Sequence, residues 1–199
     1  MPRTRAFDET EVLLRARDLF WEHGYTATSI DDLEKHLGIS RSSLYRTFGG
    51  KRQLYDRTLG NYQQENLGRL RETLFEAPRL RERLQELFTG TALRHDAKCK
   101  SGSRGCYIVN VTTEMANACS RALDFVAANR EQFVVILRGA LLHAQQLGQL
   151  RPEADCTALA NYLFLCYNGL QVVVQTNADR ATLVKAVALA IEGLPWMEK

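Results

Sequence analysis

The sequence predicts an all-α protein of about nine helices, on two observations. Apolar residues recur at the three-and-four spacing of a helix through most of the chain, whereas the alternation that marks a strand never persists. Proline is rare, and Pro78, Pro152 and Pro195 fall where helices are expected to begin or end. A hydrophobic content of 45% over 199 residues is ample for a buried core.

The first helix is expected to begin at Asp8, which forms a capping-box pattern with Glu11, and to end at Gly24. A second, short helix is capped near residue 28 or 29 and stops at Gly38. Both segments place their apolar residues on one face.

A third helix starts after the capping residue Ser40 and runs to about Phe48, where Gly49-Gly50 breaks it. A fourth, long helix starts at Lys51 and runs to about Phe75. Two short helices joined by a glycine-containing turn of about four residues are typical of the helix-turn-helix.

The third helix has two chemically different faces. Its inward positions are apolar and belong to Leu44, Phe48 and the preceding Ile39. Its outward positions belong to Arg41, Ser42, Tyr45 and Arg46, which share one face because residues 41 and 45, and residues 42 and 46, are each four apart. Residues 35–55 contain five basic residues and no acidic one, although the whole chain carries a formal charge of only +3. Such a local cationic patch suits contact with phosphates, and the alternative is an ordinary solvated face.

The remaining helices are expected at about 79–95, from about 105, and at about 120–147, 153–176 and 179–193. Residues 156–178 contain no Lys, Arg, Asp or Glu, a length that could cross a membrane. Asn and Gln recur along this segment, however, and no basic cluster flanks it. We therefore expect no membrane partner and predict burial of this helix in a subunit interface.

The cysteines and the N-terminus indicate the compartment. The five cysteines are odd in number and irregularly spaced, without a C-x-x-C motif, and the first residues lack an apolar signal core. These features are not those of a disulfide framework, and we expect a reducing, cytoplasmic location.

Residues 8–59 resemble the TetR (tetracycline-repressor) family of bacterial transcriptional regulators. The resemblance rests on two motifs, G-[YF]-x-x-T-[ST]-[IV] from Gly24 and S-x-x-x-L-Y-x-x-F-x-x-K-x-x-L from Ser40. The run GCYIVN within residues 101–114 also looks like a sequence of one subgroup of the family. The rest of the chain matches the family only in helix count and length.

The resemblance implies an all-α homodimer that binds a double-stranded DNA operator. No cofactor is predicted. Residues 1–50 would form the DNA-binding domain, and residues 51–199 would enclose a ligand pocket and dimerise through the last two helices. The protein would most often be a repressor of a palindromic operator. A bound effector would change the separation of the two DNA-reading heads and so release the DNA.

Carried onto this sequence, the family pattern places DNA contacts at Thr28, Ser40, Arg41, Ser42, Tyr45, Arg46, Thr47 and Lys51. Arg41 and Ser42 would meet base edges in the major groove, where an arginine can bond a guanine bidentately. Tyr45 and Lys51 would contact phosphates, as would Thr28 at the start of the second helix. Arg46 would add a further positive charge close to the DNA. Thr47 departs from the histidine that the family often has at this position.

The effector site is predicted only by residue type and location. Aromatic residues with a few polar neighbours suit a modest apolar or aromatic ligand. The candidates are Phe88, Tyr107, Phe125, Phe133, His143, Tyr167, Asn168 and Gln171.

A thiol sensor is the alternative mode of control. Cys106 is expected at a helix N-terminus close to basic residues, where a thiolate is stabilised, and Cys99 could resolve an oxidised Cys106 as a disulfide. The competing interpretation is that Cys106 is a small buried residue that packs at the start of the helix.

Two further classes receive little support. A metal site from His95, Cys99 and Cys106 lacks a fourth ligand and a known zinc spacing, so no metal is predicted. A helical enzyme would need a pair such as Cys106–His143 or Cys106–His95, and no catalytic motif accompanies either pair. We therefore predict that the protein is not an enzyme.

Overall fold

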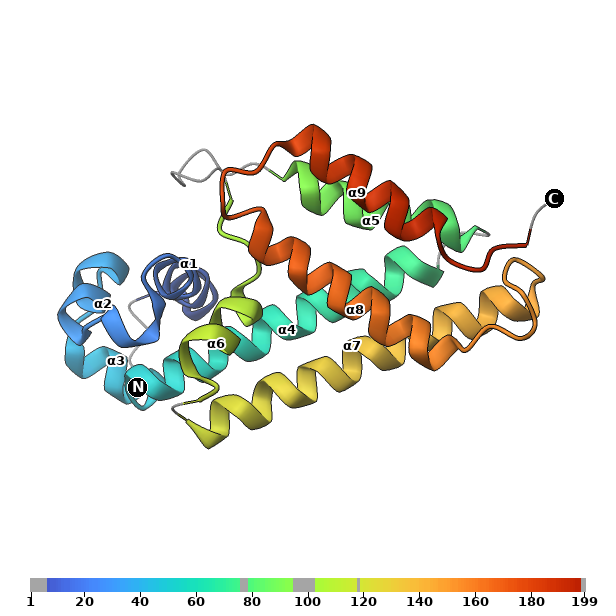
Figure 1. The fold of residues 1–199 in the computed structure, drawn as a ribbon. Helices are drawn as coiled ribbons and strands as arrows, with labels where there is room; N and C mark the ends of the chain where they lie inside the picture. The colour runs from blue at the N-terminus through green and yellow to red at the C-terminus, as the bar shows by residue number, and fades with distance from the viewer. Residues whose placement is uncertain (1–6, 76–78, 95–102, 118, 198–199) are drawn as a thin grey trace. The chain divides into compact units, whose positions relative to one another are not determined.

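The computed structural model describes residues 7–75, 79–94, 103–117 and 119–197, and within these ranges it contains nine α-helices (Figure 1). The only β-type pairing in the same ranges is an isolated antiparallel bridge between Leu150 and Trp196. The predicted fold class is therefore confirmed. The chain divides into two compact units, unit 1 (residues 1–64) and unit 2 (residues 65–199), and the division falls within α4 (Lys51–Phe75).

Unit 1 consists of α1 (Glu9–Ala27), α2 (Ile30–Leu37), α3 (Arg41–Phe48) and the first part of α4. Asp8 caps α1 by accepting a hydrogen bond of 2.8 Å from the Thr10 N–H. The predicted capping box with Glu11 is not formed; the Asp8 carboxylate bonds nearer to the helix start. Gly24 interrupts the regular helix with φ 80° and ψ 169°, and the chain then continues helically to Ala27.

The core of unit 1 is built around buried leucines and aromatic rings. Leu33, Leu44 and Leu54, which lie on α2, α3 and α4, have no exposed surface. The Phe20 and Tyr55 rings meet edge to face with centroids 5.0 Å apart, a favoured arrangement for aromatic pairs. This core fixes α3 relative to α2 and so determines which of its side chains face outward.

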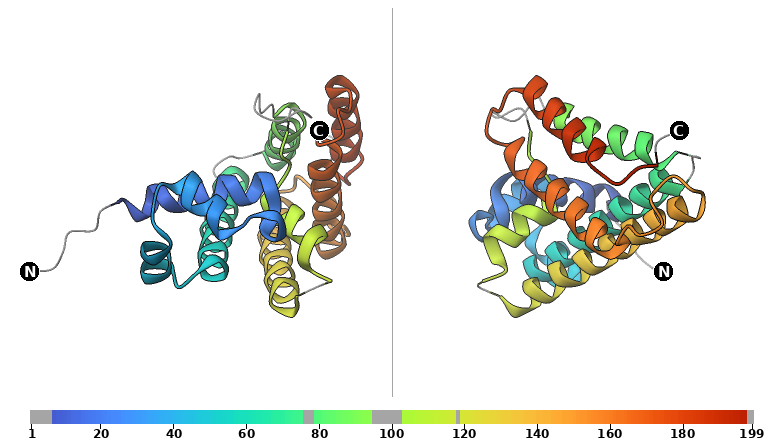
Figure 2. Two further views of the ribbon diagram at one scale, coloured as in Figure 1. Left: turned by 90° about the vertical axis from the view of Figure 1, so that its left-hand side faces the viewer. Right: turned by 45° about the vertical axis from the view of Figure 1, so that its right-hand side comes forward.

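Unit 2 contains α5 (Leu80–Leu93), α6 (Tyr107–Met115), α7 (Ser120–Gln146), α8 (Cys156–Val173) and α9 (Arg180–Glu192). Helix α7 packs chiefly against α8, and α5 against α9 (Figures 1 and 2). Helix α8 begins three residues later than the expected Glu153, because the Asp155 carboxylate caps it by accepting from the backbone N–H groups of Thr157 and Ala158.

Helix α8 is apolar on two sides but buried on only one. Ala160, Leu163 and Tyr167 belong to the core of unit 2, whereas Leu165 and Val172 are 69% and 45% exposed. No helix among the described residues is long and apolar enough to span a membrane. The charge-free segment therefore supplies both a core face and an exposed apolar face.

A glycine holds the start of α6 against α8. Gly105 has φ 64°, and a Cβ on it would overlap the side-chain amide of Gln175 and the carbonyl oxygen of Gln171. The Gln175 amide donates to the Gln171 carbonyl at 2.9 Å and to Asn110 Oδ1 at 3.3 Å. Only a residue without a side chain allows this contact.

We expect Gly105→Ala to lower the free energy of unfolding by about 2 kcal/mol or more, because it adds both backbone strain and overlap. Gly90→Ala is the matched control, since Gly90 lies in α5 with nothing within 4 Å of its added Cβ. That change should stabilise by about 0.5–1 kcal/mol through helix propensity. Urea unfolding of the two variants measures both effects, and equal stabilities would contradict the close packing of Gly105.

Candidate nucleic-acid interface

Residues 30–48 form the predicted helix-turn-helix in unit 1. Helix α2 ends at Gly38, whose φ of 69° is left-handed and whose N–H donates to the Glu34 carbonyl at 3.0 Å. Ile39 is buried beneath the turn, and Ser40 caps α3. The turn therefore consists of residues 38–40 and packs α3 tightly against α2.

Helix α3 presents the polar face that its periodicity predicts. Leu44 and Phe48 are buried, while the outward positions Arg41, Ser42, Tyr45 and Arg46 are exposed. Half of the Tyr45 surface is accessible, and Arg46 makes no ion pair with any described residue. A cationic and hydroxyl-bearing surface of this kind matches the chemistry of a DNA backbone and of base edges.

The side chain of Ser40 is committed to capping. Its hydroxyl accepts from the Ser43 N–H at 3.3 Å and lies 3.0 Å from the Ser42 hydroxyl. Thr47 is half-buried in the last turn of α3. The DNA contacts predicted for these side chains stay predictions, and the cap itself is a structural role of Ser40.

The two glycines after α3 both adopt positive φ, 86° at Gly49 and 132° at Gly50. A Cβ on Gly50 would lie 3.2 Å from Cε1 of Tyr45. Gly50 therefore makes room for the Tyr45 ring, which is a reason for glycine at this position beyond the ending of α3.

Lys51 opens α4 above an aromatic ring. Its ammonium nitrogen lies 4.2 Å from the centroid of the Tyr25 ring, in cation–π geometry. Arg52 lies 5.6 Å from the same centroid and pairs with Asp56 at 3.2 Å. Tyr25 thereby holds the Lys51 ammonium group at the start of α4.

The start of α2 differs from the prediction for Thr28. Thr28 is buried, and its hydroxyl donates to the Gly24 carbonyl at 2.6 Å. The exposed Ser29 is the N-cap and forms a full capping box with Asp32, with bonds of 3.1 Å and 2.9 Å. The exposed hydroxyl at this helix start therefore belongs to Ser29 and is engaged with Asp32, and a phosphate contact of Thr28 would have to use its backbone.

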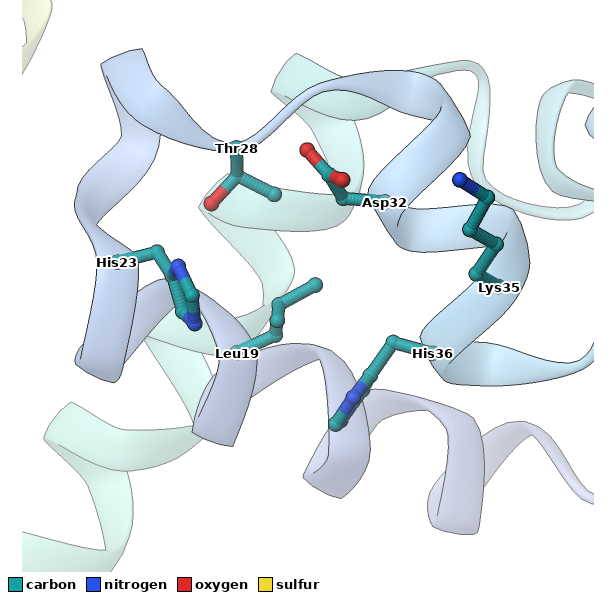
Figure 3. Close-up of a pocket in the computed structure, with 6 residues that line it drawn as sticks. All are labelled: Leu19, His23, Thr28, Asp32, Lys35 and His36. Carbon is teal, nitrogen blue, oxygen red and sulfur yellow. The ribbon is translucent and has the colours of Figure 1, made fainter.

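A hollow of about 340 Å³ lies between α1 and α2 (Figure 3). It is lined by Leu19, His23, Thr28, Asp32, Lys35 and His36. The hydroxyl of Ser29 donates to Asp32, and this bond, with the backbone bond of the same residue, lowers the pKa of the Asp32 carboxyl below its ordinary value of 3.8. Asp32 therefore remains ionised and keeps its capping role at neutral pH.

In unit 2 the structure brings several effector candidates together. The Tyr167 ring centroid lies 5.4 Å from that of Phe88 and 5.3 Å from that of Phe133. Burial raises the pKa of Tyr167, against hydrogen bonds to Thr91 and Gln171 that lower it. Gln171 is itself buried, so this aromatic cluster (Phe88, Phe133, Tyr167) contains satisfied polar groups.

The other candidates have different environments. Tyr107 is buried in the first turn of α6, and Phe125 is half-buried on α7, outside the residues of the unit 2 core. Asn168 donates its amide to the Phe164 carbonyl in its own helix. His143 is exposed on α7, so its inclusion among pocket residues is not supported.

Cys106 is buried at the N-cap position of α6 and makes no side-chain capping bond. Cys99 and the neighbouring Lys98 and Lys100 lie outside the described residues, as does His95. In the part of the chain that is described, no three potential ligands are close enough to hold a metal ion. The burial of Cys106 favours the packing interpretation over the thiol sensor.

Sequence reasoning missed two acidic neighbours of α3. The Arg41 guanidinium lies 3.3 Å from the Asp31 carboxylate, and the Arg41 N–H donates to the Glu34 carboxylate. Both acids project from α2, three residues apart. The sequence shows that Asp31 and Glu34 are three residues apart on one helix, but it does not show that Arg41 lies beside them across the turn.

Comparisons with known proteins agree with this geometry. The family model "Bacterial regulatory proteins, tetR family" matches residues 12–58, and "Tetracyclin repressor-like, C-terminal domain" matches residues 77–190. The chain is 32% identical over 197 residues to the uncharacterised HTH-type transcriptional regulator YezE of Bacillus subtilis, covering 98% of this chain and 100% of YezE. It is 25% identical to the HTH-type transcriptional repressor ComR of Escherichia coli, covering 99% and 93% of the two chains.

A solved structure extends the comparison. A cysteine-substituted TetR family regulator, CifR, in complex with a 26 bp double-stranded operator DNA, superposes with a TM-score of 0.86. The two chains are 28% identical, and the match covers 97% of this chain and 100% of CifR.

We expect Ser29→Ala to lower the midpoint of thermal unfolding at pH 7 by about 3 °C, because α2 loses its cap. The folded-state pKa of Asp32 is lowered, so the stability from its capping bond is present above about pH 4 and is lost as the pH falls through that pKa. The difference between wild type and variant should therefore shrink in acid. Ser29→Thr, which preserves the capping hydroxyl, is the control, and a pH-independent difference would contradict the role of Asp32.

Proposed function

Because this chain belongs to the tetR family of bacterial regulatory proteins, we propose that it represses transcription from a palindromic operator and is released by a small molecule. It is a DNA-binding transcriptional regulator. The observation that carries the proposal is the exposed face of α3, which places Arg41, Ser42, Tyr45 and Arg46 on one side of a helix-turn-helix.

In the proposed complex α3 enters the major groove. Arg41 and Ser42, in the first turn of α3, meet base edges, because the N-terminal residues of a recognition helix reach deepest into the groove. Tyr45, Arg46 and Lys51 contact phosphates and fix the register. Two copies of the chain read the two halves of an inverted repeat, which is why the operator is expected to be palindromic.

The second copy docks on α8 and α9. The exposed apolar side chains on these helices include Tyr162, Leu165, Val172 and Leu189, the last 73% exposed. Apolar side chains of this size gain most by burial against a partner. Pairing through the two helices gives the charge-free side of α8 an apolar environment.

The effector is proposed to bind at the aromatic cluster of unit 2. Phe88, Phe133 and Tyr167 offer apolar contact, while Thr91 and Gln171 offer hydrogen bonds. A ligand that enters must replace those bonds, since an unpaired buried polar group is costly. A small, mostly apolar molecule with one or two polar groups fits this chemistry.

A regulator of bacterial transcription acts where the DNA is, so we propose a cytoplasmic location. We also propose that the protein is not an enzyme, which a substrate screen that detects turnover would contradict. Control by a reactive thiol is the second candidate, favoured only by the position of Cys106 at a helix start.

The direct test is selection of bound duplexes from a randomised double-stranded library by the purified wild-type protein. Enrichment of an inverted repeat supports the proposal, and enrichment of no sequence contradicts it. Binding should weaken as salt rises, because phosphate contacts release counterions.

Arg41→Ala and Lys51→Ala should weaken binding of the selected duplex in different ways. We expect Arg41→Ala to relax preference at one base position by about 1–3 kcal/mol. Lys51→Ala should weaken binding to all sequences alike and reduce the salt slope by about 1. Titrations against single-base variants of the duplex, at several salt concentrations, separate the two. An unchanged base preference in Arg41→Ala would contradict the placement of α3.

Cys106→Ser should leave binding of the selected duplex unchanged in reducing buffer, because the buried thiol makes no side-chain capping bond. The comparison is a gel-shift titration of wild type and variant, reduced and after quinone treatment. Loss of the shift only in treated wild type would overturn effector control in favour of the thiol sensor.

A further inference from the structure

The guanidinium of Arg41 is held by an acid from the neighbouring helix. Its Nη2 atom lies 3.3 Å from Oδ1 of Asp31, and both side chains are mostly exposed, 59% and 73%. Asp31 lies in the first turn of α2, and Arg41 is the first residue of α3. The pair therefore spans the turn at the surface where α3 begins.

A second acid of α2 fixes the same residue from the backbone side. A carboxylate oxygen of Glu34 accepts a hydrogen bond from the Arg41 N–H, one of the N–H groups that a helix start leaves without an intrahelical acceptor. Asp31 and Glu34 are three residues apart on α2 and so share one face. Backbone and side chain of Arg41 are thus each bonded to an acid.

An exposed ion pair of this kind contributes little to folding, so its effect is better sought in binding. A guanidinium carries five N–H donors in a planar fork, and Asp31 occupies one nitrogen. The remaining donors suffice for a bidentate contact with a guanine. Arg41 can therefore bond Asp31 and a base together, while the contact with Asp31 limits the orientations that its guanidinium takes.

The carboxylate also changes how Arg41 behaves toward DNA of any sequence. Binding without base contacts depends on cations that neutralise phosphates. A guanidinium already paired with Asp31 supplies little net charge for that purpose, and releasing it would leave a carboxylate facing a polyanion. Asp31 therefore disfavours phosphate contacts of Arg41 while permitting a base contact.

We propose that Asp31 is a specificity-determining positioning residue, which orients Arg41 toward a base and suppresses its use in non-specific binding. The inference rests on the proposed function, because it requires that α3 reads DNA. It adds a residue outside the recognition helix to the set that determines operator choice.

The test compares wild type, Asp31→Ala, Asp31→Glu, Arg41→Ala and the double variant. The affinity of each protein is measured for the duplex selected by wild type and for a scrambled duplex of equal length and composition, at several salt concentrations. Glu22→Ala is the matched control, because Glu22 is an exposed acid of α1 with only a 4.0 Å approach to His23. Circular dichroism confirms that each variant is folded.

We expect Asp31→Ala to lower the ratio of specific to non-specific affinity roughly tenfold, within the range of one base contact. Its salt slope on the scrambled duplex should steepen by about 0.9, as Arg41 becomes available to a phosphate. Asp31→Glu should restore part of the ratio, Glu22→Ala should preserve it, and Asp31→Ala should add nothing once Arg41 is absent.

The inference would be overturned if folded Asp31→Ala had the same ratio of specific to non-specific affinity, and the same salt slope on the scrambled duplex, as wild type. The same holds if Asp31→Ala lowers the ratio equally with and without Arg41, because Asp31 would then act independently of that residue. If wild-type protein selects no duplex at all, the proposed function fails first, which separates the two results.

Discussion

The surface that we propose to face DNA depends on how the turn at residues 38–40 packs α3 against α2. Gly38 adopts the left-handed conformation that ends α2, and Ile39 then enters the core together with Leu33 and Leu44. Once those apolar side chains are buried, the rotation of α3 about its own axis is fixed, because its apolar residues all lie on one face. Its polar residues must then face outward. The reading surface is therefore a consequence of core packing rather than of any preference of the polar residues themselves.

The same turn determines the electrostatics of that surface. Residues 35–55 contain no acid, so the segment looks purely cationic as a sequence. In space, however, Asp31 and Glu34 lie beside the first residue of α3, and Tyr25 lies beneath Lys51. Arg41 is therefore paired with an acid, and Lys51 is held over an aromatic ring. The surface around α3 is therefore less uniformly positive than the sequence of residues 35–55 suggests. This favours recognition of DNA through particular contacts over attraction by positive charge alone.

Unit 2 combines two demands on one helix. The inner side of α8 supplies Tyr167 and Gln171 to a buried cluster in which polar groups are hydrogen-bonded, and its outer side supplies exposed apolar residues. Gly105 brings the start of α6 against the same helix. A change at the cluster thus acts on a helix that also carries the proposed contact with a second copy. This arrangement gives effector binding a physical route to the dimer.

The sequence by itself determined the helices, since caps and breakers act within a few residues: α3 occupies residues 41–48 because Ser40 and Gly49 bound it. It also determined the two faces of α3, which follow from helical periodicity alone. Only the tertiary structure decided that Thr28 is buried, that His143 is exposed, and that Arg41 is paired with Asp31. Burial and partners across a turn depend on how separate helices pack, and the spacing of residues along one helix does not encode that packing.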